Sequence, residues 1–195
     1  MNRIFNPENK HKLDSEERRK LIPPEKILDL MNINFGETFL DVGAGTGYFA
    51  LIAAKYVGTN GRVIAADVSQ EMLDEIKLRS LETNQNIELL LCKADSINIG
   101  DSLADKILMA FVFHEIDKKA DYLKEMYRVA KNNCELTIVE WEKVDSQIGP
   151  PINDRISSQD LIQIAESSGF FVIKHEKINP YQYLLIFNKK NNTVV

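Results

Sequence analysis

Hydrophobic and polar positions alternate along the chain with two periods, one typical of strands and one typical of helices. Seven short stretches alternate at period two or are apolar throughout, and they predict strands over residues 38–42, 62–67, 87–93, 106–113, 135–142, 171–178 and 182–188. In longer stretches apolar residues recur every three or four positions, which predicts helices over residues 23–30, 47–57, 69–83, 118–130 and 157–169. Strands and helices therefore follow one another through most of the chain.

This alternation predicts a doubly wound α/β fold. Parallel neighbouring strands need crossover connections, and the intervening helices supply them on both faces of a sheet. We therefore expect a Rossmann-like three-layer sandwich around a seven-stranded, mostly parallel sheet. The last two strands are separated only by a turn at Asn179–Pro180, so they should form an antiparallel hairpin. Ligands of such folds bind beyond the carboxyl ends of the strands, which confines the search for a site to the loops there.

The chain length of 195 residues fits one main domain. We place this domain at residues 23–190, with residues 1–22 as an N-terminal lid or arm and residues 191–195 as a tail. Glycine is distributed unevenly, because three of the nine glycines lie within residues 43–47. This clustering indicates that the backbone of residues 43–47 must be free of side chains at several positions.

Charge and apolar runs exclude several classes of protein. The formal net charge of −5 argues against a nucleic acid as the main partner. The longest apolar run, residues 107–113, is too short to span a membrane, and the N-terminus lacks the apolar core of a signal peptide. Cys92 and Cys134 lie in strand-like stretches and fit buried free thiols in a reducing compartment. We therefore predict a cytoplasmic protein, and the oligomeric state stays open.

The glycine-rich run follows directly on the first predicted strand. Gly43, Gly45 and Gly47 let a ligand approach the backbone, and the next helix begins with free amide donors. A dinucleotide-binding loop would have a further glycine at the position of Tyr48. Asp41 precedes the glycines, and the loop contains no lysine or arginine. This setting would favour a ligand that carries an ammonium and a sulfonium over a pyrophosphate.

Two further loops have residues suited to a nucleoside. Asp67 ends the second predicted strand, and its carboxylate can accept hydrogen bonds from both hydroxyls of a ribose. Alternatively, Asp67 only caps the following helix, although Ser69 already stands at the capping position. Residues 94–96 (Ala-Asp-Ser) follow the third strand and could recognise an adenine, with Val68 and Met72 against the two faces of the ring. This last signal is weak alone, since Asp-Ser pairs are common in turns.

Together these features resemble the class I S-adenosylmethionine-dependent methyltransferases, in particular the small ubiquinone/menaquinone-biosynthesis type (methyltransferase type 11). The resemblance covers about residues 20–188 and rests on the D-x-G-x-G-x-G run of residues 41–47, on Asp67, on residues 94–96 and on the order of elements. It implies the strand order 3-2-1-4-5-7-6 with the last strand antiparallel. It also implies S-adenosylmethionine as the cofactor, with the glycines against its methionine part, Asp67 on its ribose and Asp95 near its adenine amine. The implied cofactor-binding residues are Asp41, Gly43, Ala44, Gly45, Thr46, Gly47, Asp67, Val68, Met72, Ala94, Asp95, Ser96 and Ala110.

A fourth segment, residues 110–116, ends the fourth predicted strand, where the resemblance places the reactive methyl group and its acceptor. Methyl transfer is an in-line displacement from a good leaving group, so the protein mainly aligns the reactants and excludes water. A base is needed only when the acceptor is protonated, and His114 is the candidate catalytic residue for that role. The alternative is that His114 and Glu115 merely lead into the next helix.

The remaining candidate residues concern the acceptor and access to the site. Trp141 ends the fifth strand and could form a wall of the acceptor site, with the Gly-Pro-Pro loop of residues 149–155 above it; a core tryptophan is an equal alternative. Phe111, Phe113 and Trp141 fit a quinone-like or other small apolar acceptor, but so would a structural use of these rings. The charged stretch of residues 10–19 is either part of a lid or a solvated helix face.

We therefore expect an enzyme that transfers a methyl group from S-adenosylmethionine to a small-molecule acceptor. One alternative is a non-catalytic domain that binds S-adenosylmethionine as a sensor or docks a partner. Another is a nicotinamide-dependent oxidoreductase, which Tyr48 and the acidic glycine loop disfavour. No metal site and no nucleic acid partner are expected, and the identity of the acceptor stays open.

Overall fold

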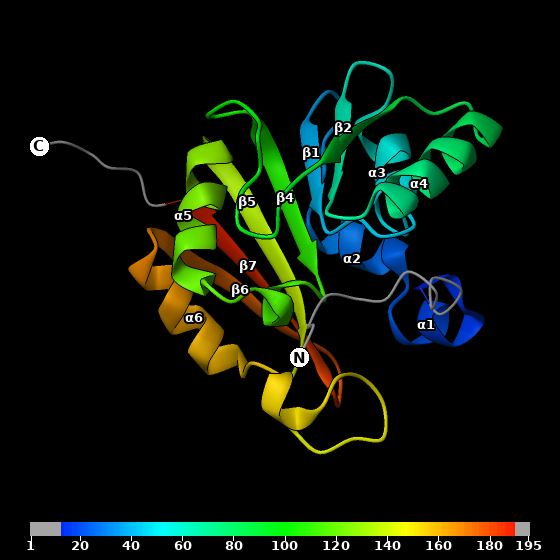
Figure 1. The fold of residues 1–195 in the computed structure, drawn as a ribbon. Helices are drawn as coiled ribbons and strands as arrows, with labels where there is room; N and C mark the ends of the chain where they lie inside the picture. Colours follow the sequence, from blue (N-terminus) through cyan, green and yellow to red (C-terminus); the bar gives the residue numbers. More distant parts are fainter. Residues whose placement is uncertain (1–12, 190–195) are drawn as a thin grey trace, which may run out of the picture. The chain divides into compact units, whose positions relative to one another are not determined.

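The computed structural model describes residues 13–189 (Figure 1). The strands are β1 (Thr38–Val42), β2 (Arg62–Asp67), β3 (Ile87–Leu91), β4 (Ala104–Ala110), β5 (Ala130–Trp141), β6 (Phe170–Asn179) and β7 (Gln182–Lys189). The helices are α1 (Glu16–Leu21), α2 (Pro24–Leu30), α3 (Ala50–Val57), α4 (Gln70–Glu82), α5 (Lys119–Val129) and α6 (Ser158–Ser167), with 3-10 turns η2 (Phe113–Glu115) and η3 (Ile152–Asp154). The strand order is β3-β2-β1-β4-β5-β7-β6, which confirms the predicted Rossmann-like class and order.

The chain forms two compact units, which divide between Ile97 and Asn98. In the first unit β1, β2 and β3 are parallel neighbours, with Leu40 opposite Ile64 and Ala65 opposite Leu89. Helix α3 packs on β1 and β2, and α4 packs on β2 and β3. Strands β1 and β2 are buried at every position except the first, because helices cover the faces of a parallel sheet.

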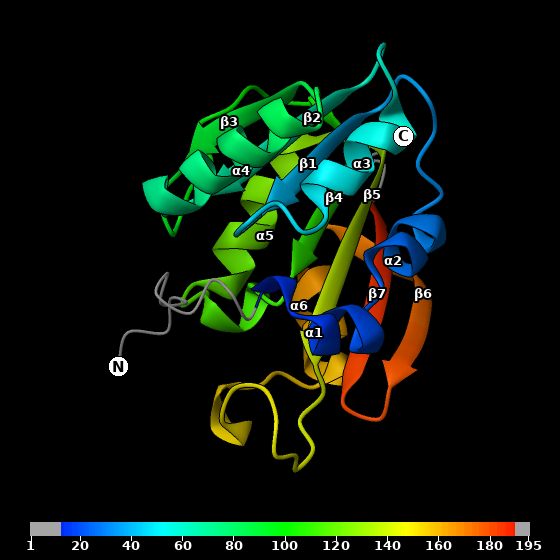
Figure 2. The same ribbon diagram turned by 90° about the vertical axis from the view of Figure 1, so that its right-hand side faces the viewer.

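In the second unit β4 and β5 are parallel, whereas β7 runs antiparallel to both β5 and β6. The predicted terminal hairpin is therefore confirmed, and Figure 2 shows it as the orange and red pair of strands. Helices α5 and α6 contact each other, and they also pack on β5 and β6 respectively (Figure 1). A long loop, residues 142–157, leaves the carboxyl end of β5 and returns to α6 (yellow in Figure 2).

Local chemistry explains where several elements begin. The hydroxyl of Ser69 accepts a hydrogen bond from the Met72 amide, which caps α4. Ser157 caps α6 in the same way through the Asp160 amide. The bounds predicted for β1 and β2 are confirmed residue for residue. Helix α3 begins three residues later than predicted, because residues 46–49 form turns rather than helix.

Other boundaries also differ from prediction. Strand β4 ends at Ala110 instead of residue 113, because Phe111 has a left-handed backbone (φ 61°) and breaks the extended conformation. Strand β3 ends at Leu91, since the chain then turns and the Lys93 amide bonds to the Ser96 carbonyl. Helix α5 passes directly into β5, which therefore begins at residue 130. Helix α1 lies in the charged stretch that the sequence indicates as part of a lid or as a solvated helix face.

The two cysteines differ in their surroundings. Cys134 is buried in β5, as predicted, whereas Cys92 lies just beyond β3 and is only half-buried. Both thiols are free within the described residues. Burial raises the pKa of Cys92 to about 11 and that of Cys134 to about 12, so neither is a ready thiolate.

Some predictions cannot be compared with the structure. Lys10, His11 and Lys12 of the expected lid, and the expected tail of residues 191–195, lie outside the described residues. None of the helices within residues 13–189 combines the length and the apolar character needed to cross a membrane.

Candidate functional site

The glycine loop, residues 43–47, leaves the carboxyl end of β1 in a conformation that favours glycine. Its three glycines have φ angles of 68°, 55° and 83°, which other residues adopt only with strain. Two loop amides donate hydrogen bonds to the Ala66 carbonyl at 2.8 and 3.0 Å, which ties the loop to β2. The sequence motif is therefore a folded turn held between the first two strands of its unit.

The glycines have different neighbours. A Cβ atom at Gly47 would lie 3.1 Å from Ile76 Cγ1 and 3.2 Å from Leu51 Cδ1, so this glycine permits the turn to pack against α3 and α4. A Cβ atom at Gly45 would instead lie 3.2 Å from Leu13 Cδ1, in the N-terminal segment. The side of Gly45 that lacks a side chain therefore faces the N-terminal segment.

Asp67, at the end of β2, is connected to the glycine loop. Its Oδ2 accepts a hydrogen bond from the Gly45 amide at 2.8 Å, and its Oδ1 accepts one from the Ser69 amide at 2.9 Å. Burial raises the pKa of Asp67, and these backbone hydrogen bonds oppose the rise. Each carboxylate oxygen keeps capacity for a further donor. Asp67 thus braces the helix start, as the alternative interpretation held, and still has acceptor capacity for a ligand hydroxyl.

Asp41 is buried beneath the glycine loop. Its Oδ2 and the hydroxyl of Thr46 are buried and have no hydrogen-bond partner within residues 13–189. Burial raises the pKa of Asp41 to about 7; a hydrogen bond from the Ala50 amide opposes the rise, and the charge of Asp67 adds to it. A buried carboxyl without a full set of partners is costly unless a ligand supplies them.

Two arginines that are remote in sequence lie at the glycine loop. Arg79 Nη1 donates to the Thr46 carbonyl at 2.7 Å, and the Arg18 guanidinium lies 4.4 Å from the ring centroid of Tyr48. The charge of Arg18 also acts on Asp41. The loop itself has no basic residue, as the sequence indicated. The fold nevertheless brings these two arginines to it, so the surroundings of the loop contain positive as well as negative charges.

The N-terminal segment, residues 13–22, contacts the same loop region. Arg79 Nη1 forms an ion pair with Asp14 at 3.0 Å, and the Tyr48 hydroxyl donates to the Ile22 carbonyl at 2.8 Å. With the approach of Leu13 to Gly45 and of Arg18 to the Tyr48 ring, the segment is attached at several points around the glycine loop.

The residues expected around an adenine belong to the same unit. Val68 is 38% exposed, whereas Met72 is buried in the first turn of α4. Ala94 and Asp95 form an exposed turn, and Ser96 closes it by pairing with residue 93. Val68 and the 94–96 turn are therefore accessible to a ligand, and Met72 is mostly covered.

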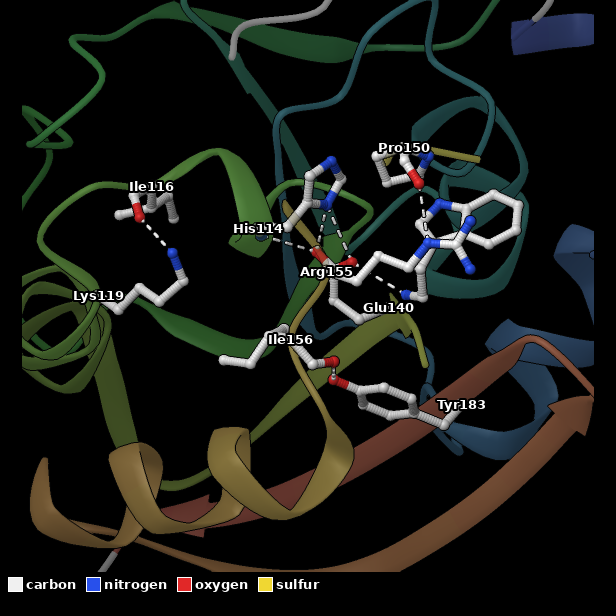
Figure 3. A network of polar contacts seen from close by, with 9 residues as sticks. His114, Ile116, Lys119, Glu140, Pro150, Arg155, Ile156 and Tyr183 are labelled. Atoms are coloured by element: carbon white, nitrogen blue, oxygen red, sulfur yellow. Dashed lines mark hydrogen bonds and ion pairs between the residues drawn. The ribbon is translucent and has the colours of Figure 1, made fainter. Parts of the chain in front are cut away.

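Two expected site residues, Ala110 and His114, belong to the second unit. Ala110 ends β4, and His114 lies in the 3-10 turn η2 that follows. The His114 ring nitrogen Nδ1 is 3.0 Å from both carboxylate oxygens of Glu140, the penultimate residue of β5 (Figure 3). Glu140 also accepts hydrogen bonds from the His114 and Trp141 amides at 3.0 Å.

The His114–Glu140 pair is almost removed from solvent. Glu140 is fully buried and His114 is 9% exposed. Burial lowers the pKa of His114, but the hydrogen bond to Glu140 and the charges of Glu140 and Glu115 outweigh it, so the net shift is upward. Sequence reasoning missed the role of Glu140. The available signal was a carboxylate at a core position of an otherwise apolar strand end, since buried charges require partners.

An aromatic surface lies at the same strand ends. The rings of Phe111 and Trp141 are 5.6 Å apart, and both residues are half-buried. Phe113 is fully buried, so it belongs to the core and does not face an acceptor. A Cβ atom at Gly149 would lie 2.8 Å from the Trp141 indole, so the loop passes closely over this ring.

Arg155 organises the loop that covers Trp141. Its guanidinium lies 5.3 Å from the Trp141 ring centroid and donates to the Pro150 carbonyl at 2.8 Å (Figure 3). It also donates to the carbonyls of Val144 and Ile148 at 2.8 and 2.7 Å. The sequence indicated a loop stiffened by proline at this place but did not reveal the arginine as its centre.

Comparisons with known proteins found a matching family model and similar proteins. A family model described as the ubiE/COQ5 methyltransferase family matches residues 17–180. The ubiquinone/menaquinone biosynthesis C-methyltransferase UbiE of Haemophilus ducreyi is 32% identical over 132 residues, which are 67% of this chain and 48% of that protein. The chain spans about half the length of the curated relatives it matches.

Solved structures show the same fold. A SAM-dependent methyltransferase from Aquifex aeolicus superposes with a TM-score of 0.89 at 33% sequence identity and covers 94% of this chain and 98% of its own. The 1,6-didemethyltoxoflavin-N1-methyltransferase of Burkholderia thailandensis gives a TM-score of 0.69 at 17% identity, over 88% of this chain and 78% of its own. At that identity the second likeness concerns the fold alone.

Proposed function

Because the chain belongs to the ubiE/COQ5 methyltransferase family, we propose that it transfers a methyl group from S-adenosylmethionine to a small-molecule acceptor. The observation that carries the proposal is the hydrogen bond from the Gly45 amide to Asp67, which holds a carboxylate with spare acceptor capacity at the rim of the glycine loop. Neither the Haemophilus ducreyi relative nor the Aquifex aeolicus structure is named as a binding-only domain or a nicotinamide enzyme.

The described residues fit this cofactor. The buried Asp41 Oδ2 and Thr46 hydroxyl have no hydrogen-bond partner in the described part of the chain, and a ligand with an ammonium group would supply a donor to them. Asp67 can accept from two ribose hydroxyls beyond the two amides that it already binds. Val68 and the 94–96 turn offer an exposed apolar side chain and polar groups for an adenine.

We assign cofactor binding to the residues named from the sequence: Asp41, Gly43, Ala44, Gly45, Thr46, Gly47, Asp67, Val68, Met72, Ala94, Asp95, Ser96 and Ala110. S-adenosylmethionine, when bound, supplies a methyl group on a sulfonium; its carbon–sulfur bond breaks as the acceptor forms the new bond, and the sulfur keeps the bonding pair. The chain holds the cofactor and excludes water. His114 accepts the proton that a protonated acceptor loses.

The acceptor that we propose is a reduced quinone or a similar hydroxylated aromatic molecule. The UbiE relative is named as a C-methyltransferase of ubiquinone and menaquinone biosynthesis. In this chain the half-buried rings of Phe111 and Trp141 offer an apolar surface suited to an aromatic molecule.

Titration calorimetry with S-adenosylmethionine and S-adenosylhomocysteine tests the cofactor. We expect binding tighter than millimolar, and its absence would contradict the proposal. Incubation with methyl-labelled cofactor and a prenylated 1,4-naphthoquinol, in parallel with a metabolite extract, tests the transfer. Cofactor binding with no labelled product in either incubation would favour the binding-only alternative.

The affinity for S-adenosylmethionine should fall as the pH drops below about 7. Asp41 has a folded-state pKa of about 7, and a bound ammonium favours its charged form. Binding then releases a proton at low pH, and the affinity falls by up to about tenfold per pH unit. Calorimetry between pH 5.5 and pH 8 measures the effect. Asp41→Asn should remove the dependence, and methylthioadenosine, which lacks the amino acid part, should not show it.

We also propose that the N-terminal segment (residues 13–22) acts as a lid on the glycine loop. Replacing Asp14 by asparagine removes the ion pair with Arg79 but leaves the hydrogen bond from Arg79 to the Thr46 carbonyl, and it should accelerate release of S-adenosylhomocysteine by about 1.4-fold to fivefold, because exposed pairs contribute about 0.2–1 kcal/mol. Stopped-flow competition measures the release rate. Arg62→Gln, which breaks the ion pair of similar exposure between β2 and β3, is the matched control and should leave the rate unchanged. Equal release rates in both variants would contradict the lid.

A further inference from the structure

The Glu140 side chain forms hydrogen bonds to both the ring and the backbone amide of His114 and to its own neighbour Trp141. Its two oxygens meet the His114 ring, the His114 amide and the Trp141 amide, all at 3.0 Å. We propose that Glu140 is a positioning residue that sets the tautomer of His114, so that Nε2 becomes the proton acceptor of the reaction. This inference rests on the proposed methyl transfer and specifies the acceptor chemistry.

The tautomer follows from the chemistry of the two side chains. An ionised carboxylate can only accept hydrogen bonds, so the Nδ1 atom between its oxygens must carry the proton. The lone pair of the neutral ring then lies on Nε2. In Figure 3 this second ring nitrogen points away from Glu140. Without Glu140 the imidazole could place its proton on either nitrogen, and only one of these forms has a base at Nε2.

Glu140 is itself held in place. The His114 amide belongs to the turn after β4, and the Trp141 amide belongs to the end of β5. These two donors hold the carboxylate at the ring and fix the ring plane relative to both strands. Because Glu140 is fully buried, water does not compete for its carboxylate oxygens.

Charged groups on three elements act on the ring. Burial lowers the pKa of His114, as does Lys119 from α5, whereas Glu140 from β5 and Glu115 from η2 raise it, and the net shift is upward. The base is active only when neutral. Activity should therefore rise with pH through the raised pKa of His114 and level off above it.

The pair specifies a class of acceptor, namely one that loses a proton at the hydroxyl or carbon being activated. As the acceptor electron pair forms the bond to the methyl carbon, the proton passes to Nε2. The resulting imidazolium keeps its Nδ1–H on Glu140, which stabilises the positive charge. An aromatic hydroxyl compound meets this condition, whereas a tertiary amine has no proton to lose and would not need the pair.

Glu140→Gln tests the positioning role, because glutamine preserves the side-chain shape and changes only its hydrogen bonding. Its amide group places a donor where Nδ1–H or a backbone amide now donates, so the ring is driven toward the Nε2–H tautomer. We expect kcat to fall by about 10²-fold or more with KM little changed. The rising limb of the pH profile should move to lower pH by about one unit.

Nitrogen-15 NMR of the imidazoles gives a readout that does not depend on activity. The chain has three histidines, so single substitutions assign the His114 signals. The unmodified protein should show the Nδ1–H tautomer and an upward-shifted pKa, and Glu140→Gln should reverse both. Glu140→Asp, which keeps the charge, should restore part of the rate and the original tautomer.

Glu142→Gln is the matched control. This carboxylate lies on the strand exit two residues further along and bonds to Ser158, not to the histidine. It should leave the pH limb and the tautomer of His114 unchanged.

The inference is overturned if His114 carries its proton on Nε2 in the unmodified protein. It is also overturned if Glu140→Gln transfers the methyl group with the same pH–rate profile as the unmodified protein, because Glu140 would then only connect the two strand ends. Failure of the proposed function is recognised separately, since the cofactor would not bind and the tautomer could still be read.

Discussion

Replacing His114 by glutamine should reduce methyl transfer by about 10²- to 10⁴-fold. The variant loses the imidazole that we propose as the base, while glutamine can still accept or donate one hydrogen bond near Glu140. Affinity for S-adenosylhomocysteine should remain close to that of the unmodified protein, because the ring is not among the proposed cofactor contacts. Initial rates with labelled cofactor and a prenylated 1,4-naphthoquinol measure the loss.

His175→Gln is the control for this experiment. His175 lies exposed on β6 with its ring 6.1 Å from that of Tyr183, so its removal should not affect transfer. A His114→Gln variant with an unchanged rate at saturating acceptor would reject the base. The reaction would then depend on alignment of the reactants alone.

Replacing Asp67 by alanine should weaken binding of S-adenosylmethionine by about 1–3 kcal/mol, which is about fivefold to 150-fold in Kd. The lost interactions are the proposed charge-assisted hydrogen bonds to the ribose hydroxyls. The structure adds a second cause, since the Gly45 and Ser69 amides also lose their acceptor. Titration calorimetry on the folded variant measures the change in affinity.

Ser69→Ala is a control for loss of stability at the start of α4. It removes the cap of α4 at a cost of about 0.5–2 kcal/mol in stability and leaves the carboxylate in place. We expect lower thermal stability for this variant with nearly unchanged cofactor affinity. Asp67→Ala with unmodified affinity would discard the ribose assignment.

Local patterns accounted for much of the fold. The apolar runs of β1 and β2, the Ser69 cap of α4 and the short turn of the terminal hairpin are each determined by neighbouring residues, and the structure confirms them. The strand order required the family resemblance in addition, because periodicity reveals elements but not which strands become neighbours.

Boundaries failed where a single backbone angle or a direct junction decided them. The left-handed Phe111 ends β4 inside an apolar run that favours a longer strand. The passage from α5 straight into β5 contains no glycine or proline that would have marked it. Such features depend on the packing of neighbouring elements, and propensities average over packing.

The candidate site divides in the same way. The sequence alone located the glycine loop, Asp41 and Asp67, since these residues lie at strand ends and their chemistry is evident from their type. Only the tertiary structure brought Arg18 and Arg79 to that loop and paired His114 with a carboxylate 26 residues away. The physical reason is that charge and hydrogen-bond partners act through space over a few ångströms. Spacing along the chain therefore identifies the groups, and folding determines which of them meet and in which protonation state they act.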